Sequence, residues 1–137
     1  MGSTVIDMIS HLALLRRHLE EGSPTGAIIS LLIELGVPTN KLGFELLKYA
    51  IDLQSKNPTR ALKNDIYLEI ALHYQQNSES QVEQAIRDTI KKAWKDGKRE
   101  AWEMYFSCGG SALKSKPPNR EFISRMAYIV ALLPNCR

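Results

Sequence analysis

The sequence contains little cysteine and histidine and no arrangement typical of a catalytic or metal site. Its two cysteines, Cys108 and Cys136, are too few for a disulfide framework and lack the CxxC spacing of a zinc or redox motif. Its three histidines, His11, His18 and His73, have no cysteine or carboxylate partner at metal-ligand spacing. Cys108 lies beside two glycines, but no base or orienting group accompanies it. The sequence therefore predicts no enzyme, no metal, no cofactor and no small-molecule substrate.

The sequence also lacks a basic leader and a long apolar run. Asp7, Ser10 and His11 interrupt the apolar residues of the opening segment, which resembles neither a signal peptide nor a membrane span. No other segment is a better candidate, so we expect a cytoplasmic protein without membrane contact. The length of 137 residues, with 44% hydrophobic and 24% charged residues, is typical of one globular domain.

Positive charge is unevenly distributed along the chain, although the net charge is only +3. Residues 1–60 contain six basic and six acidic residues and are neutral. Residues 87–99 contain six basic and two acidic residues, and residues 114–137 contain five and one. Because the distribution says more about partners than the total does, these two late segments are the ones to examine for binding.

Apolar residues recur with a helical period in every long segment, and no segment alternates as a strand does. The sequence therefore predicts an all-α fold, a compact domain of six to seven helices. Residues 1–24 should form an extra N-terminal helix and a linker, and residues 25–137 the main domain. The apolar stripe of that first helix either packs on its own domain, as we expect, or pairs with another helix. It consists of Val5, Met8, Leu12, Leu15 and Leu19.

Local signals indicate where the helices begin and end. Gly36 and Pro38 should end a helix over residues 27–35. The next helix should end at residues 56–59, and the last helix should end at Pro134. Side chains that can accept hydrogen bonds from the first backbone N–H groups stand before the other helices. The predicted caps are Thr39 or Asn40, Asn64 or Asp65, Ser78 or Ser80, and Asn119.

Residues 65–95 have the layout of a helix-turn-helix DNA-binding unit. A short helix with Ala71 on its inner face is followed by a polar turn and a longer helix with a polar, then basic, outer face. Gln81, Gln84 and Arg87 occupy the first exposed turns, where amide and guanidinium groups can reach base edges. Lys91, Lys92 and Lys95 follow, where contact with backbone phosphate is expected. The alternative is that both helices are ordinary bundle members with solvated outer faces.

Four segments, taken in order, carry a resemblance to a known family: ELGVPTNKLGFELLKYAI, YLEIALHY, VEQAIRDTIKKAW and KSKPPNREFI. Together they resemble the C-terminal DNA-binding domain of the sporulation master regulator of endospore-forming bacteria, the stage zero sporulation protein A. The resemblance covers about residues 25–133. It implies a six-helix domain that binds duplex promoter boxes, often as head-to-tail pairs, and contacts the RNA polymerase sigma factor.

The resemblance also implies DNA contacts at particular residues. Ser80, Glu83 and Arg87 match the family pattern at the start of the recognition helix, and Ser78 is the other residue that could begin this helix near a phosphate. Lys114 and Lys116 match the KxKPxN segment of the family and are candidates for phosphate contact, with a solvated loop as the alternative.

The sequence departs from the family pattern at several places. Gln81 and Gln84 replace two arginines, which should move base preference from guanine toward adenine and weaken the electrostatic attraction to DNA. Asp88 stands where the family tends to be basic, and the turn before Ser80 is one residue longer. No receiver domain precedes the domain, so the chain is either an excised domain or a stand-alone relative. A protein-interaction module that binds a sigma factor or a full-length regulator is therefore the alternative function.

Overall fold

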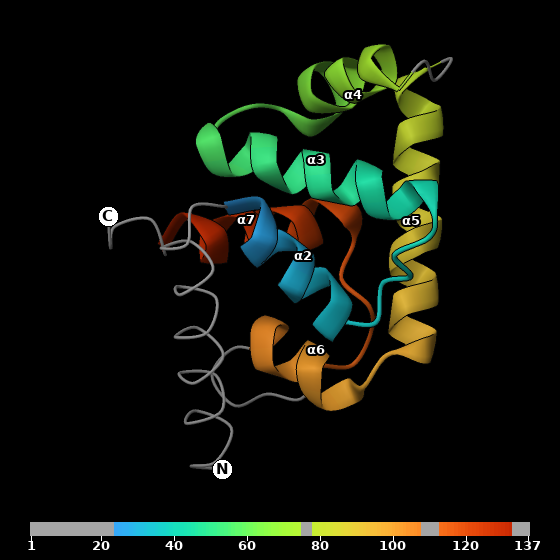
Figure 1. The fold of residues 1–137 in the computed structure, drawn as a ribbon, viewed down its shortest axis with the longest axis vertical. Helices are drawn as coiled ribbons and strands as arrows, with labels where there is room; N and C mark the ends of the chain where they lie inside the picture. The colour runs from blue at the N-terminus through green and yellow to red at the C-terminus, as the bar shows by residue number, and fades with distance from the viewer. Residues whose placement is uncertain (1–23, 75–77, 108–112, 133–137) are drawn as a thin grey trace.

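The computed structural model describes residues 24–74, 78–107 and 113–132, and within these ranges the chain contains six α-helices, one π-helical turn and no strand (Figure 1). The all-α prediction is confirmed. The predicted helix before residue 24, its apolar stripe and the predicted stop at Pro134 lie outside the described residues. The elements are α2 (Pro24–Glu34), α3 (Leu42–Lys56), the π turn η1 (Leu62–Ile66), α4 (Tyr67–His73), α5 (Glu79–Asp96), α6 (Arg99–Phe106) and α7 (Asn119–Leu132).

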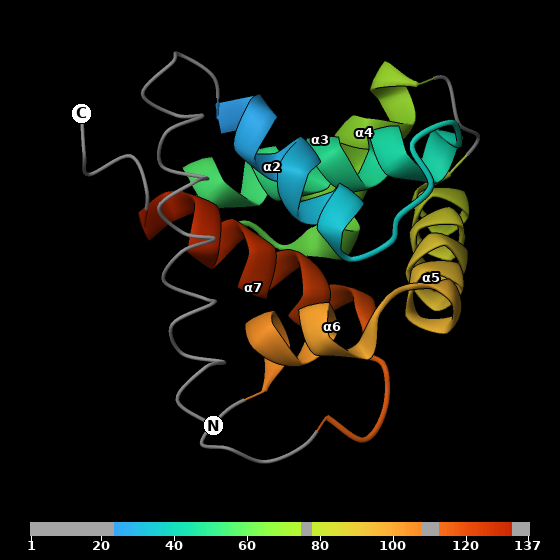
Figure 2. The same cartoon turned by 60° about the horizontal axis from the view of Figure 1, so that its bottom comes forward.

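The centre of the domain is formed by α2, α3 and α7, which pack against one another through their apolar faces (Figure 2). On α7 the inward positions Phe122, Ile123 and Met126 are fully buried, as the helical period predicted. The buried Trp102 of α6 stacks on Phe106, with ring centroids 5.5 Å apart, and its ring is tilted against that of Phe122, with centroids 5.6 Å apart. Burial of this much apolar surface is the main force that stabilises such a bundle.

The predicted stop at Gly36 is confirmed, and it brings the end of α2 close to the end of α5. Gly36 has a φ of +90°, a conformation that residues with a Cβ atom rarely adopt. A Cβ atom at Gly36 would lie 2.8 Å from Cα of Gly97, so the two backbones approach too closely for side chains. Trp102 completes this junction, because its Nε1–H donates to the carbonyl of Leu35 at 3.0 Å.

The long helix α5 lies along one side of the domain, where it contacts α3, α4, α7 and η1 (Figure 1). Its closest approach to α3 is at Gly43, where a Cβ atom would lie 1.7 Å from Oγ1 of Thr89. Thr89 donates this hydroxyl to the carbonyl of Ala85 at 2.8 Å. Gly43 therefore sets how closely α5 packs on the core.

Two of the predicted helix caps are wrong. The helix α3 begins after Lys41, which has no capping side-chain bond, and not after Thr39 or Asn40. Asn64 and Asp65 lie within η1, which continues directly into α4. The cap positions before η1 and α4 are Ala61 and Ile66, and the Asp65 carboxylate accepts two hydrogen bonds from Arg60.

Candidate nucleic-acid interface

The helices α4 and α5 have the order and the packing that the helix-turn-helix prediction requires. Figure 1 shows α4 lying across the N-terminal end of α5, and the two helices are in contact. Ile70 and Ala71 of α4 are buried, as the prediction of an inner face at Ala71 requires. Residues 75–77, between the two helices, lie outside the described residues, so the predicted turn and its extra residue stay predictions.

The helix α5 begins at one of its two predicted caps. Ser78 has an extended backbone, and its hydroxyl accepts a hydrogen bond from the backbone N–H of Gln81 at 3.2 Å. This is the usual N-cap arrangement, which satisfies one of the free N–H groups at a helix start. Ser80, the other candidate, lies inside the first turn and is exposed.

The two faces of α5 divide as the sequence predicted. Val82, Ile86, Ile90 and Ala93 are buried against the domain. Ser78 and Glu83 are half-buried at the edge of the outer face. The exposed predicted contact residues are Ser80, Gln81, Gln84, Arg87, Lys91, Lys92 and Lys95. The structure therefore brings these side chains together along one helix face.

Four side chains in the middle of this face are joined by hydrogen bonds. Arg87 donates from Nη2 to Glu83 at 3.2 Å and from Nη1 to Oε1 of Gln84 at 2.8 Å. Gln84 in turn donates from Nε2 to Asp88 at 2.8 Å. We call these four residues, Glu83, Gln84, Arg87 and Asp88, the α5 ladder. The sequence predicted three of them as DNA contacts and Asp88 as a departure from the family pattern, but it did not predict that they are connected.

The basic residues of the two late segments have different surroundings. Lys92 pairs with Asp96 at 3.1 Å, whereas Lys91 and Lys95 form no ion pair within the described ranges. Arg99 lies over the ring of Trp94, 4.2 Å from its centroid, and also donates to a loop carbonyl. Part of the positive charge is thus used in packing and pairing, and Lys91 and Lys95 stay available at the surface.

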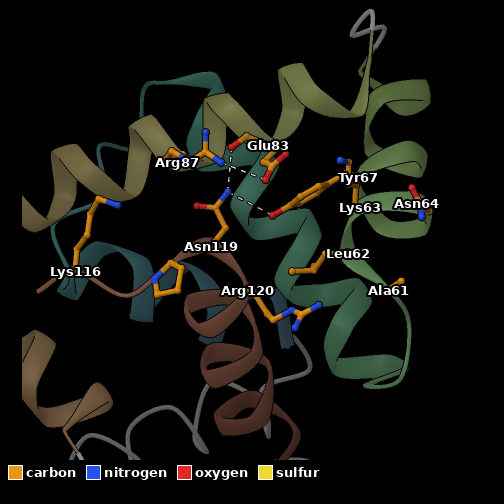
Figure 3. A pocket seen from close by; sticks show the side chains of 11 residues that line it. Ala61, Leu62, Lys63, Asn64, Tyr67, Glu83, Arg87, Lys116, Asn119 and Arg120 are labelled. Atoms are coloured by element: carbon orange, nitrogen blue, oxygen red, sulfur yellow. Dashed lines mark hydrogen bonds and ion pairs between the residues drawn. The ribbon is translucent and has the colours of Figure 1, made fainter.

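A hollow of about 450 Å³ lies beside α5, between η1 and the loop that leads into α7 (Figure 3). Four cationic side chains and one carboxylate contribute to its wall, so its charge is predominantly positive. Lys116, predicted as a phosphate contact, lines the hollow, whereas the exposed Lys114 does not. Sequence analysis missed Lys63 and Arg120, although Arg120 directly follows the KxKPxN segment. The charged lining residues are Lys63, Glu83, Arg87, Lys116 and Arg120.

Asn119 joins α7 to α5 at the edge of this hollow. Its side-chain amide donates to the carbonyl of Glu83 at 3.0 Å and to the hydroxyl of Tyr67 at 3.4 Å (Figure 3). Asn119 is the first residue of α7, and these two contacts use its amide nitrogen, whereas a cap would use its amide oxygen, so its predicted capping role stays a prediction. Burial raises the pKa of the Tyr67 hydroxyl, which therefore stays protonated at neutral pH.

The π turn that leads into α4 is held by polar contacts that sequence analysis did not identify. Arg60 donates to both Asp65 and Glu69, and the Arg60 guanidinium lowers the pKa of the Asp65 carboxyl. The buried amide of Gln54 donates to the carbonyls of Pro58 and Arg60 at 2.9 and 3.2 Å. These contacts join the loop before η1, which leads to Lys63, to α3, η1 and α4.

Within the part of the chain that the structure describes, no group of three or more His, Cys, Asp or Glu side chains is placed to hold a metal ion. None of the described helices is both long enough and apolar enough to cross a membrane.

The chain matches a known protein family over most of its length. The family described as "Sporulation initiation factor Spo0A C terminal" matches residues 28–130. The matched range begins in α2 and ends in α7. It therefore includes the whole outer face of α5 and every residue that lines the hollow.

Proposed function

Since the chain belongs to the Spo0A C-terminal family, which is a family of DNA-binding domains of sporulation regulators and not of enzymes, we propose that it is a transcription regulator that binds duplex DNA sequence-specifically. The observation that supports this most strongly is the outer face of α5. Amide and guanidinium side chains are exposed near its N-terminal end and lysines farther along, with α4 lying across its start. A helix of 18 residues is about 27 Å long, enough to lie in a major groove.

In this proposal the two parts of α5 have different roles. Gln81, Gln84 and Arg87 read base edges, because their side chains can make paired hydrogen bonds. Lys91, Lys92 and Lys95 contact phosphates, which adds affinity without sequence preference. Ser78, Ser80 and Glu83 lie at the helix start, where the protein meets the DNA backbone. We infer that α4, the turn and α5 together form a helix-turn-helix over about residues 65–95.

The hollow beside α5 extends the phosphate-binding surface. Lys63, Lys116 and Arg120 come from three separate segments but line one concavity, whose position next to Arg87 suits a backbone phosphate on the flank of the site. Lys114, exposed on the same loop as Lys116, would contact the duplex farther out. We further propose that two copies bind neighbouring boxes and that the bound protein contacts the RNA polymerase sigma factor.

The division of roles is tested by comparing Arg87→Ala with Lys91→Ala. Selection from random duplexes first gives the preferred site. Arg87→Ala should then lose about 1 to 3 kcal/mol on that site and relax preference at one base position, whereas Lys91→Ala should weaken binding to all duplexes alike. In a salt titration, Lys91→Ala should reduce the slope of affinity against salt by about one unit. An equal, sequence-independent loss in both variants contradicts the assignment.

A second candidate function is protein binding, and a specific observation favours it. Leu68 and Leu72 lie one turn apart on α4, with 43% and 74% of their surfaces exposed. An exposed apolar pair of this kind suits a helix of a sigma factor or of a full-length regulator. The salt titration separates the two functions, because contact with several phosphates gives a steep slope and an apolar contact gives a shallow one. Failure to bind any duplex at low salt would leave protein binding as the function.

A further inference from the structure

Asp88 is the residue on the outer face of α5 that fits DNA binding least well, because its carboxylate faces the same side as the proposed contacts. Its charge should weaken binding to every duplex by a similar factor, since repulsion from phosphate does not depend on base sequence. The α5 ladder gives it a second effect that does depend on sequence. Its Oδ1 accepts a hydrogen bond of 2.8 Å from Nε2 of Gln84.

The ladder leaves only one orientation for the Gln84 side-chain amide. Arg87 can only donate hydrogen bonds, so the end of the Gln84 amide that faces it must be the oxygen. Ionised Asp88 can only accept hydrogen bonds, so the end that faces it must be the nitrogen. An isolated glutamine can exchange these two ends by rotating its terminal bond. Between Arg87 and Asp88, the exchanged orientation would place donor against donor and acceptor against acceptor.

The remaining hydrogen-bonding groups of Gln84 match one base. The amide has two N–H groups and two oxygen lone pairs, and the ladder uses one of each. One donor and one acceptor are left, side by side, and this pair is complementary to N7 and the N6 amino group of adenine in the major groove. A glutamine free to rotate could instead donate to guanine or accept from cytosine.

We propose that Asp88 is a specificity-determining positioning residue, which orients the amide of Gln84 so that it reads adenine. Asp88 acts through Gln84 and need not touch the base itself. This inference rests on the proposed DNA-binding function. The Asp88 carboxylate would then weaken binding to DNA but increase the preference for adenine.

The test compares Asp88→Ala with the matched variant Asp88→Asn. Both variants remove the charge, but the asparagine oxygen can still accept from Gln84 whereas alanine cannot. The probe is a set of four duplexes that carry the selected site and differ only at the base pair where Gln84→Ala loses its preference. Affinities are measured for the full chain at one fixed salt concentration.

Both variants should bind all four duplexes more tightly than the wild type does, because a negative charge is gone. Asp88→Asn should keep the wild-type preference for adenine within about twofold. A correct paired contact discriminates by roughly 5- to 150-fold, so Asp88→Ala should lower the preference by about fivefold or more. Identical preference in the two variants would show that Asp88 acts through its charge alone and would overturn the inference.

A measurement without DNA separates failure of this inference from failure of the proposed function. The side-chain amide resonances of Gln84 in a ¹H–¹⁵N spectrum should shift in Asp88→Ala and stay close to the wild type in Asp88→Asn. If Gln84 does not respond to Asp88→Ala, the ladder is absent and the inference fails while DNA binding stands. If the ladder is present but the wild type binds no duplex, the proposed function fails, and so does the proposed role of Gln84 and Asp88 in recognising adenine.

Discussion

Gly43→Ala should destabilise the protein by forcing α5 away from α3. The added Cβ atom would lie 1.7 Å from Oγ1 and 2.8 Å from Cβ of Thr89. Overpacking of this kind costs about 1 to 3 kcal/mol, and displacing the Thr89 hydroxyl from the Ala85 carbonyl costs about 1 kcal/mol more. Alanine offsets about 0.5 to 1 kcal/mol, because it fits a helix better than glycine does. The expected net loss in the free energy of unfolding is about 1 to 3 kcal/mol.

A double-mutant cycle with Thr89 identifies the cause of this loss. In a Thr89→Ala background the nearest atom is removed, so Gly43→Ala should cost at least about 1 kcal/mol less than in the wild type. Thr89→Ser keeps Oγ1 and is the matched control, in which the cost should stay close to the wild-type value. The assay is urea unfolding followed by far-UV circular dichroism. If Gly43→Ala is neutral in the wild type, or equally costly in all three backgrounds, the close packing of α3 on α5 is not as described.

Two further predictions concern the junctions around α5. Trp102→Phe removes the donor to the Leu35 carbonyl and should lower the free energy of unfolding by about 2 to 4 kcal/mol. Trp94→Phe, at a half-buried ring, should cost clearly less, and similar losses would refute the role of the buried bond. Asp65 has a folded pKa below its usual 3.8, so its stabilising effect is present above that pH and is lost as pH falls through the folded pKa. The stability difference between wild type and Asp65→Asn in urea unfolding should therefore shrink below pH 4, and a constant difference would contradict the Arg60 contact.

The fold class and the faces of α5 could be predicted from the sequence because they depend on local repeats. Burial of Val82, Ile86 and Ile90 follows from the helical period, and the stop at Gly36 follows from a conformation that glycine adopts easily. Ser78 was predicted as a cap because its hydroxyl reaches an N–H group three residues away. In each case the partner lies within a few residues along the chain.

The polar contacts around the candidate site could not be predicted in the same way. Asp65 was predicted as a cap, but it lies inside η1 and its carboxylate binds Arg60. The amide nitrogen of Asn119 bridges two other elements, and these contacts were not predicted from the sequence. The cationic hollow needs residues from η1, α5 and the loop before α7, and no motif joins them in the sequence. The α5 ladder is local, yet the sequence does not show which rotamers its long side chains adopt.

The sequence by itself determined that this chain is helical, which face of each helix is buried and where the basic residues are concentrated, because period and composition are properties of neighbouring residues. Only the tertiary structure decided which donor meets which acceptor. Asn119 lies 36 residues from Glu83 and 52 from Tyr67, and it contacts both because packing of α7 on the bundle brings them within hydrogen-bonding distance. A polar side chain can bond either the nearby backbone or such a distant partner. Which of the two it bonds depends on geometry that exists only in the folded chain.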